Sequence, residues 1–227
     1  ERETAELREQ STAVLGHDLR TPLGAVMSGA EFLLLKHQDP STRQVAERIQ
    51  RSARRMSALV EDVVDFTRGR MGDGLALELR MLHGADLRLY EVVDELSSLH
   101  PDRVIDSAIQ PGLSLHCDPE RLSQLLSNLL KNALVHGSEQ HPVFVVANVR
   151  NGVFTLRVTN GGPDLSPAVI AQLLKPYWRA SSRAGSEGLG LGLYIVDQIA
   201  RGHGGIIDVS SSAGSTSFTF TMPAAAM

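Results

Sequence analysis

His17 and Asp18 stand in the stretch LGHDLRTPLG, residues 15–24, with helical periodicity on both sides. The apolar residues Leu15, Leu19 and Leu23 begin a series at steps of three and four, the spacing of one stripe on a helix. His17 lies about 200° around from that stripe at about 100° per residue, so its ring is available to a partner. Periodicity alone equally fits a solvated surface histidine, and other residues must decide between the two interpretations.

Asn128 and Asn132 are four residues apart in a second helical stretch, and His136 continues their row. The leucines between them occupy the other side of the helix. An amide oxygen is a hard, neutral ligand that suits Mg²⁺ beside phosphates. The alternative is that these asparagines make ordinary surface contacts.

Gly188, Gly190 and Gly192 recur at every second position before an apolar helix. Glycines allow close backbone approach, and the free N–H groups of a helix N-terminus bind anions, so this run predicts a phosphate site. It lacks the ending of a Walker loop and no strand leads directly into it, which excludes a dinucleotide-binding fingerprint. A flexible glycine hinge is the alternative interpretation.

The segment VTNGGPDL places Asn160 and two glycines at the end of a predicted strand, where a turn could contact a flat ligand or simply reverse the chain. The Ser/Gly-rich stretch LLKPYWRASSRAGSE follows it. Its arginines Arg179 and Arg183 are natural phosphate contacts, or else solvated loop charges.

Two helices are predicted to carry the His-Asp pair, one over residues 3–36 and one over 41–68, separated by the turn HQDPST. Pro22 removes a backbone donor about one turn beyond His17 and can bend the first helix. Each helix has one apolar stripe, and two helices cannot cover both stripes. We therefore predict a homodimer in which two hairpins form a four-helix bundle.

The remaining chain predicts an α/β sandwich of about 150 residues. Strands are expected at 75–80, 103–109, 113–116, 143–149 and 153–159, with two more after residue 204. A helix capped by Asp118 and closed by Gly137 lies among them, and a last helix is expected at 189–201. The predicted domains are residues 1–70 and 71–227.

Composition narrows the function classes further. The chain has 227 residues, 42% of them apolar, and a formal net charge of −4, which gives no global field for nucleic acid or anionic membrane. Its one cysteine, Cys117, excludes an internal disulfide framework. No apolar run approaches the roughly 20 residues that span a bilayer, and without an initiator methionine the chain looks like a cytoplasmic fragment of a longer protein.

As a set, these motifs resemble the transmitter core of bacterial sensor histidine kinases, with phytochrome-like wording around the glycine boxes. LGHDLRTPL looks like the phosphoacceptor box, LLSNLLKNALVHG like the asparagine box, VTNGGPDL and GLGLGLYIV like the two glycine boxes, and LLKPYWR like the phenylalanine box. The resemblance covers residues 3–223. It implies a dimerisation and phosphotransfer hairpin followed by a Bergerat-type ATP-binding fold, also found in gyrase, mismatch-repair and heat-shock ATPases.

The resemblance also implies a role for each site residue. His17 would accept the γ-phosphoryl group, Asp18 would orient or deprotonate its ring, and Thr21 would position a water that removes phosphate from the partner. Asn132 would ligate Mg²⁺. The residues expected to contact ATP are Asn128, Lys131, Asn132, His136, Asn160, Gly162, Tyr177, Arg179, Gly188, Gly190, Leu191 and Gly192.

Three departures from the family pattern concern nucleotide affinity. Asn160 stands where the family usually has an aspartate that accepts the adenine amino group, which forfeits roughly 1 kcal/mol. Asp164 replaces the second glycine of its box, where it could crowd or repel a phosphate. Leu174 and Tyr177 replace phenylalanines.

The leading hypothesis is an ATP-dependent protein histidine kinase that passes phosphate from His17 to a response-regulator receiver domain. One alternative is a degenerate transmitter that binds partners or nucleotide without phosphotransfer, and another is an ATP-gated clamp, which leaves the His-Asp pair without a task. A basic cluster at residues 48–55 is the only feature for nucleic acid, and the family resemblance favours a role in receiver recognition instead.

Overall fold

The structure, a computed structural model, describes residues 2–36, 39–69, 75–179 and 189–224, with the backbone alone for residues 2–17, 68–69 and 85. The chain divides into two compact units. The smaller is built on two long helices, and the larger comprises Leu75–Ser186 and Gly190–Met227. Each unit is described by itself.

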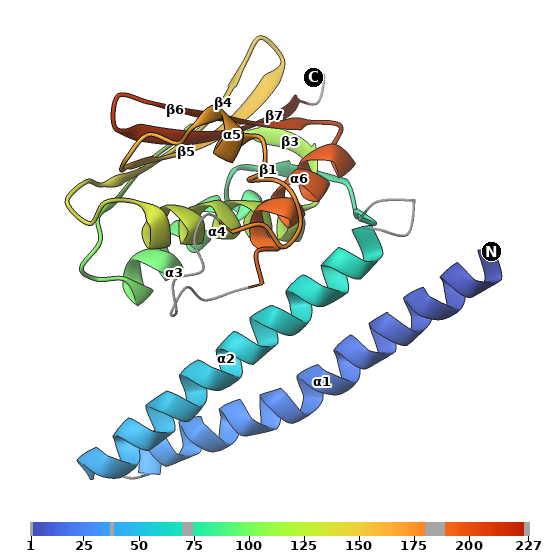
Figure 1. Ribbon diagram of the computed structural model, residues 1–227, viewed down its shortest axis with the longest axis vertical. Helices are drawn as coiled ribbons and strands as arrows, with labels where there is room; N and C mark the ends of the chain where they lie inside the picture. Colours follow the sequence, from blue (N-terminus) through green and yellow to red (C-terminus); the bar gives the residue numbers. More distant parts are fainter. Residues whose placement is uncertain (1, 37–38, 70–74, 180–188, 225–227) are drawn as a thin grey trace. The chain divides into compact units, whose positions relative to one another are not determined.

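The smaller unit is a helical hairpin, as the sequence predicted (Figure 1). Helix α1 spans Arg2–Lys36 and continues through Pro22, and α2 spans Pro40–Gly69. Asp39 caps α2, because its carboxylate accepts hydrogen bonds from the Thr42 amide at 2.8 Å and the Ser41 hydroxyl at 3.0 Å. These bonds from Thr42 and Ser41 lower the pKa of Asp39 to about 2.

The most buried side chains in the described part of the hairpin belong to small residues. Ala30 on α1 and Ala46 and Ala53 on α2 are buried. Several larger apolar residues stay open to solvent at 37–55% relative exposure, whereas Val64 and Phe66 are buried; the open ones include Val26, Phe32, Val45, Ile49, Met56 and Val63. The two helices therefore do not cover each other's apolar faces.

The larger unit is an α/β sandwich, which confirms the predicted fold class. Its five-stranded sheet has the order β2-β4-β5-β7-β6, with β2 parallel to β4 and the other pairs antiparallel. The strands are β2 (Ile105–Ile109), β4 (Val143–Arg150), β5 (Val153–Gly161), β6 (Ile206–Ser212) and β7 (Ser215–Pro223). A separate two-stranded ribbon pairs β1 (Arg80–His83) with β3 (Ser114–Cys117).

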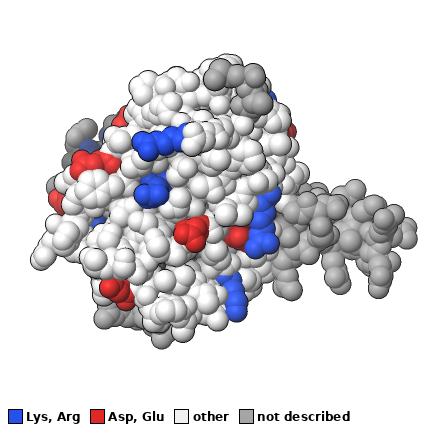
Figure 2. Space-filling model, turned by 90° about the horizontal axis from the view of Figure 1, so that it is seen from above, with Lys and Arg blue, Asp and Glu red and all other residues white. Residues whose placement is uncertain are grey.

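Helices α3 (Leu89–Leu99), α4 (Pro119–His136) and α6 (Gly192–Gly202) cover one face of this sheet (Figure 1). Alternate residues of the strands enter the core between them, including Val145, Phe154, Leu156, Phe218 and Phe220. The other face carries half-buried threonines and serines of β5 and β7. Figure 2, seen from above, shows few charged side chains on the surface facing the viewer.

The start of α4 is tied to the rest of the unit by Asp118 and His203. The Asp118 carboxylate accepts hydrogen bonds from the amides of Glu120, Arg121 and Glu78 at 2.9–3.1 Å. The Asp118 amide donates to Nε2 of His203 at 3.1 Å, and Nδ1 of that ring lies 2.8 Å from the Ile199 carbonyl. The N-terminus of α4 and the C-terminus of α6 are thus fixed to one another.

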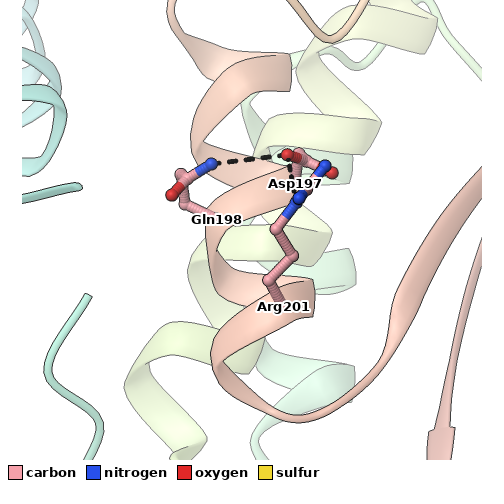
Figure 3. A network of polar contacts seen from close by, with 3 residues as sticks. All are labelled: Asp197, Gln198 and Arg201. Carbon is pink, nitrogen blue, oxygen red and sulfur yellow. Dashed lines mark hydrogen bonds and ion pairs between the residues drawn. The ribbon is translucent and has the colours of Figure 1, made fainter. Parts of the chain in front are cut away.

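Helix α6 also carries a local polar network on its surface (Figure 3). Asp197 accepts hydrogen bonds from Arg201 Nε at 2.8 Å and from Gln198 Nε2 at 3.3 Å. The pair Asp197–Arg201 has the i,i+4 spacing that supports a helix by a few tenths of a kcal/mol. A short helix behind the glycine run is thereby reinforced.

Several predicted elements are displaced or were missed. The strand predicted at 75–80 forms only from Arg80 to His83, and the last helix begins at Gly192 rather than at residue 189. Helix α3, the 3₁₀ turn η1 (Gly84–Leu87) and the short α5 (Pro167–Ile170) were not predicted. The late start of α6 follows from Gly190, whose φ of +71° is incompatible with a right-handed helix.

Candidate functional site

The asparagine row lies on the side of α4 that does not enter the core. The leucines of this helix at 122, 125, 126, 129 and 130 are fully buried. Asn128 and Asn132 are half-buried, while Lys131 and His136 are exposed. The predicted face of amide and basic side chains is therefore presented away from the sheet.

Asn128 joins this row to the glycine run. Its Nδ2 donates a hydrogen bond to the carbonyl of Gly192 at 3.3 Å, at the first residue of α6. No side chain in the described part of the chain caps the N-terminus of α6. The first N–H groups of this helix thus lie close to the asparagine row, an arrangement that can bind a phosphate.

Gly190 is packed directly against the phenylalanine box. The Tyr177 amide donates to the Gly190 carbonyl at 3.0 Å, and a Cβ on Gly190 would lie 2.9 Å from the Trp178 carbonyl oxygen. Only glycine fits this close approach at a positive φ. Two motifs that are separate in the sequence therefore meet in space.

Arg179 approaches the end of the asparagine row. Partial burial of the ring, and then the positive charge of Arg179, lower the pKa of His136. His136 is therefore predominantly neutral at pH 7, beside a guanidinium suited to phosphate. The charge of Arg179 thus acts on the ring of His136.

Asn160 occupies the end of β5 and is only 7% exposed. Its Nδ2 donates to the Gly161 carbonyl at 3.2 Å, and a Cβ on Gly137 would lie 3.0 Å from the Asn160 Cβ. The closing residue of α4 thus packs on the polar side chain that ends β5.

Thr216 lies beside Asn160 and was not singled out from the sequence. The β5–β7 register pairs the two residues, Thr216 is 5% exposed, and its hydroxyl lies 2.9 Å from that of Ser211. The buried Thr216 thus adds a second polar group beside Asn160 at the end of β5. Only the strand register reveals it, since 56 residues of sequence separate the pair.

Asp164 makes a backbone contact that was not predicted from the sequence. Its carboxylate accepts a hydrogen bond from the Gly214 amide at 2.8 Å, and the Gly162 amide donates to the Gly214 carbonyl at 2.9 Å. Asp164 therefore holds the β6–β7 turn against the end of β5.

Leu191 and Gly188 were also predicted to contact ATP. Leu191 is fully buried, so its side chain belongs to the core and only its backbone is available to a ligand. Gly188 lies outside the described residues.

The phosphoacceptor stretch lies within α1. The side chain of His17 is outside the described residues, whereas Asp18 and Thr21 follow it as exposed residues. Next to them an apolar groove opens on the hairpin, lined by Leu19, Pro22, Leu23, Val26, Met56, Leu59 and Val60. An ion pair between Arg20 and Glu61 spans the two helices at 4.0 Å.

The donor set fits Mg²⁺ only in company with phosphate. In the residues that the structure describes, no group of three or more His, Cys, Asp or Glu side chains could hold a metal ion. Asn132 offers one neutral oxygen ligand on the open side of α4. A metal bound here would take its remaining ligands from phosphate oxygens and water.

No helix in the described ranges is both long and apolar enough to cross a bilayer.

Two domain families match the sequence. The family described as "Histidine kinase-, DNA gyrase B-, and HSP90-like ATPase" matches residues 117–226, and "His Kinase A (phospho-acceptor) domain" matches residues 7–72. The two matches follow one another in the order that the motifs predicted.

Similar proteins carry the same pair of regions. The chain is 35% identical to a bacteriophytochrome of Pseudomonas aeruginosa over 223 residues, and 35% identical to the sensor histidine kinase TrcS of Mycobacterium tuberculosis over 217 residues. The alignments cover 97% and 91% of this chain but only 30% and 42% of those proteins. The chain thus spans less than half the length of these relatives.

Among solved structures, full-length ShkA in complex with AMPPNP matches 96% of this chain and 47% of its own, with a TM-score of 0.74 and 26% identity. Acinetobacter baumannii AdeS matches 92% of this chain and 98% of its own, with a TM-score of 0.61. At 20% identity, the second match concerns the fold alone.

Proposed function

The chain belongs to the sensor histidine kinases as a transmitter core, and we propose that it uses ATP to phosphorylate its own His17. The proposed phosphotransfer domain is residues 1–70 and the proposed ATP-binding domain is residues 71–227. The family matches at 7–72 and 117–226 support this division.

The observation that carries the proposal is the contact between Asn128 and Gly192. It sets the asparagine row of α4 beside the uncapped N-terminus of α6. A triphosphate placed there would meet helix N–H groups on one side and amide side chains on the other, with Arg179 and His136 near the end of the row. Asn160 and Gly162, at the end of β5, would contact the base.

His17 is the proposed nucleophile. One imidazole nitrogen forms a bond to the γ-phosphorus while the bond from that phosphorus to the bridging oxygen breaks, and ADP leaves. Asp18 would orient the ring so that the attacking nitrogen holds its lone pair. Thr21, one turn further along α1, would position a water that hydrolyses the phosphate from the receiver domain, releasing inorganic phosphate.

Mg²⁺ fits this site through Asn132 together with phosphate oxygens. When bound, the ion would offset the negative charge of the transferring group. The neighbouring Lys131 and Asn128 would hold the phosphates in place.

The proposed partners are a second copy of the chain and a receiver domain of a response regulator. The open apolar groove of the hairpin supports the homodimer, because exposed apolar surface of this kind is buried in four-helix bundles. The receiver would take phosphate from His17 on an aspartate. We further propose that the reaction takes place in the cytoplasm, where ATP and receiver domains are found together.

The direct test is labelling with γ-labelled ATP and Mg²⁺. We expect an acid-labile, base-stable phosphate on the wild type that disappears in His17→Gln. His116→Gln, which alters an exposed histidine of β3, serves as the matched control and should retain the label. Label that survives His17→Gln would exclude His17 as the acceptor.

The degenerate-transmitter alternative predicts a different result. Nucleotide would bind, yet no phosphohistidine would form with any divalent ion or with a receiver present. The role of Asp164 in the β6–β7 turn weakens the case for this alternative, because its carboxylate is engaged by a backbone amide.

A further inference from the structure

The turn between β6 and β7 leaves backbone groups open to the rest of the unit. Ala213 and Gly214 are its two central residues, between the paired Ser212 and Ser215, and they have φ values of +52° and +74°. These angles are typical of a type I′ turn, in which the amides of the central residues do not bond across the hairpin. The backbone groups of Gly214 can therefore bond to another segment.

The first glycine box, residues 158–165, bonds to both backbone groups of Gly214. The Gly214 amide donates to the Asp164 carboxylate at 2.8 Å, and the Gly162 amide donates to the Gly214 carbonyl at 2.9 Å. Because the carboxylate is charged, its hydrogen bond is stronger than one between neutral groups. Asp164 is thus the side chain that completes a two-bond link between the glycine box and the turn.

Ser211 makes a second link next to the first. The Leu165 amide donates to the Ser211 hydroxyl at 2.9 Å, and that hydroxyl lies 2.9 Å from the hydroxyl of Thr216. The next residue, Ser166, caps α5 by accepting from the Val169 amide at 3.3 Å. The chain that leaves β5 is therefore held by the β6–β7 hairpin up to the point where α5 begins.

The segment that begins at α5 leads to the phenylalanine box. Residues 171–177 form turns rather than a regular helix, so little within the segment itself fixes its direction. At its far end the Tyr177 amide donates to the Gly190 carbonyl at 3.0 Å, and Arg179 follows. Asp164 and Gly190 thus hold the two ends of one segment, and both ends adjoin residues that are proposed to contact ATP.

We propose that Asp164 is a positioning residue for the nucleotide site, an inference that rests on the proposed function. By holding the β6–β7 turn, its carboxylate orders the first glycine box and the start of the α5 segment before ATP binds. A loop that is already ordered loses less conformational freedom on binding, so the affinity is higher. A carboxylate that repelled phosphate would lower the affinity instead, and the two roles therefore predict effects of opposite sign.

Calorimetric titration of the full chain with ATP and Mg²⁺ separates these roles. Asp164→Ala removes the acceptor and should raise the dissociation constant of ATP about fivefold, the equivalent of about one hydrogen bond. Asp164→Asn removes the charge but keeps a carbonyl oxygen for the Gly214 amide, so its dissociation constant should stay within about twofold of the wild type. Rescue by asparagine distinguishes a specific contact from a general loss of charge.

Asp208→Ala is the matched control, because it removes an exposed carboxylate from β6 of the same hairpin. It should leave the affinity unchanged. If Asp164→Ala binds ATP as tightly as the wild type or more tightly, or if Asp164→Asn loses as much affinity as Asp164→Ala, the inference is wrong while the proposed function stands. If the wild type does not bind ATP, the proposed function itself is overturned, and the inference with it.

Discussion

Asp118 is a residue on which three backbone amides depend. Its nearly buried carboxylate accepts from two amides of α4 and from the Glu78 amide. We expect Asp118→Ala to lower the free energy of unfolding of the larger unit by about 2 kcal/mol, since a cap and a tertiary bond are lost together. Urea unfolding, followed by the fluorescence of the single tryptophan, Trp178, measures this change.

Asp94→Ala is the control for that experiment, because Asp94 is exposed on α3. It should change the free energy of unfolding by less than about 0.5 kcal/mol. Equal losses in the two variants would contradict the role assigned to Asp118.

His203 makes the same unit sensitive to mild acid. Burial lowers the pKa of His203 below 6.5, despite the opposing effects of the Ile199 carbonyl and Asp118. The unfolded chain therefore binds the proton more readily than the folded one. The stability of the larger unit is complete above about pH 6.5 and decreases as the pH falls from there toward the lower, folded-state pKa.

We expect thermal melts of the larger unit to show a smaller drop in Tm between pH 7.5 and 5.5 in His203→Gln than in the wild type. The glutamine oxygen can still accept from the Asp118 amide, so the variant removes the titration and keeps the contact. His136→Gln is measured alongside it in the same melts, because the pKa of His136 is also lowered. An unchanged pH dependence in His203→Gln would show that other groups cause the drop.

At the scale of elements, the end of α4 is held by an arginine from outside the helix. Arg103, between α3 and β2, donates through Nη1 to the Leu134 carbonyl at 2.6 Å and through Nη2 to the Ser138 carbonyl at 3.2 Å. A positive charge at a helix C-terminus is favourable. The Ser138 amide in turn donates a hydrogen bond to the Gly161 carbonyl, which links the end of α4 to the end of β5.

We expect Arg103→Met to lower the free energy of unfolding by about 1–3 kcal/mol and to weaken ATP binding several-fold. Arg103→Lys should cause losses between those of the wild type and Arg103→Met, because an ammonium cannot reproduce the two hydrogen bonds of the guanidinium. Calorimetric titration with ATP and urea unfolding measure the two effects. Arg157→Met, on the exposed side of the sheet, is the control, and an effect as large as that of Arg103→Met would argue against a specific role for Arg103.

The sequence predicted elements well where a local signal existed. Asp118 and Gly137 were correctly predicted to cap the two ends of α4, because a helix cap depends on residues that are close in the sequence. The asparagine row was likewise visible as spacing on one helix. Helix α3 was missed although its apolar residues are periodic, and the ribbon strand β1 was placed too early, since its ends depend on pairing with β3.

The rest of the site depends on contacts that no local pattern contains. The pairing of Asn160 with Thr216, and that of Asp164 with Gly214, both follow from strand register. In the hairpin, Ala46 and Ala53 were not singled out from the sequence although both are fully buried, because small side chains contribute little to an apolar pattern.

For the whole molecule, the open groove of the hairpin leads to a prediction about assembly. Met56 lies in the groove and is 46% exposed. We expect Met56→Glu to weaken the homodimer at least tenfold, because a charge would be placed in an apolar interface. Light scattering over a dilution series measures the mass.

Leu99→Glu is the control, since Leu99 is an exposed apolar residue of the larger unit. It should leave the dimer intact. A wild type that is monomeric at every concentration would refute the proposed bundle.

The sheet order has a consequence for how the protein is made. The central strand β5 pairs with β7, so the pairing of Asn160 with Thr216 cannot form until β7 has been synthesised. The hairpin needs only neighbouring segments, which close quickly. On the ribosome, the two helices are therefore complete, and able to meet a second nascent copy, well before the ATP-binding unit can form its sheet.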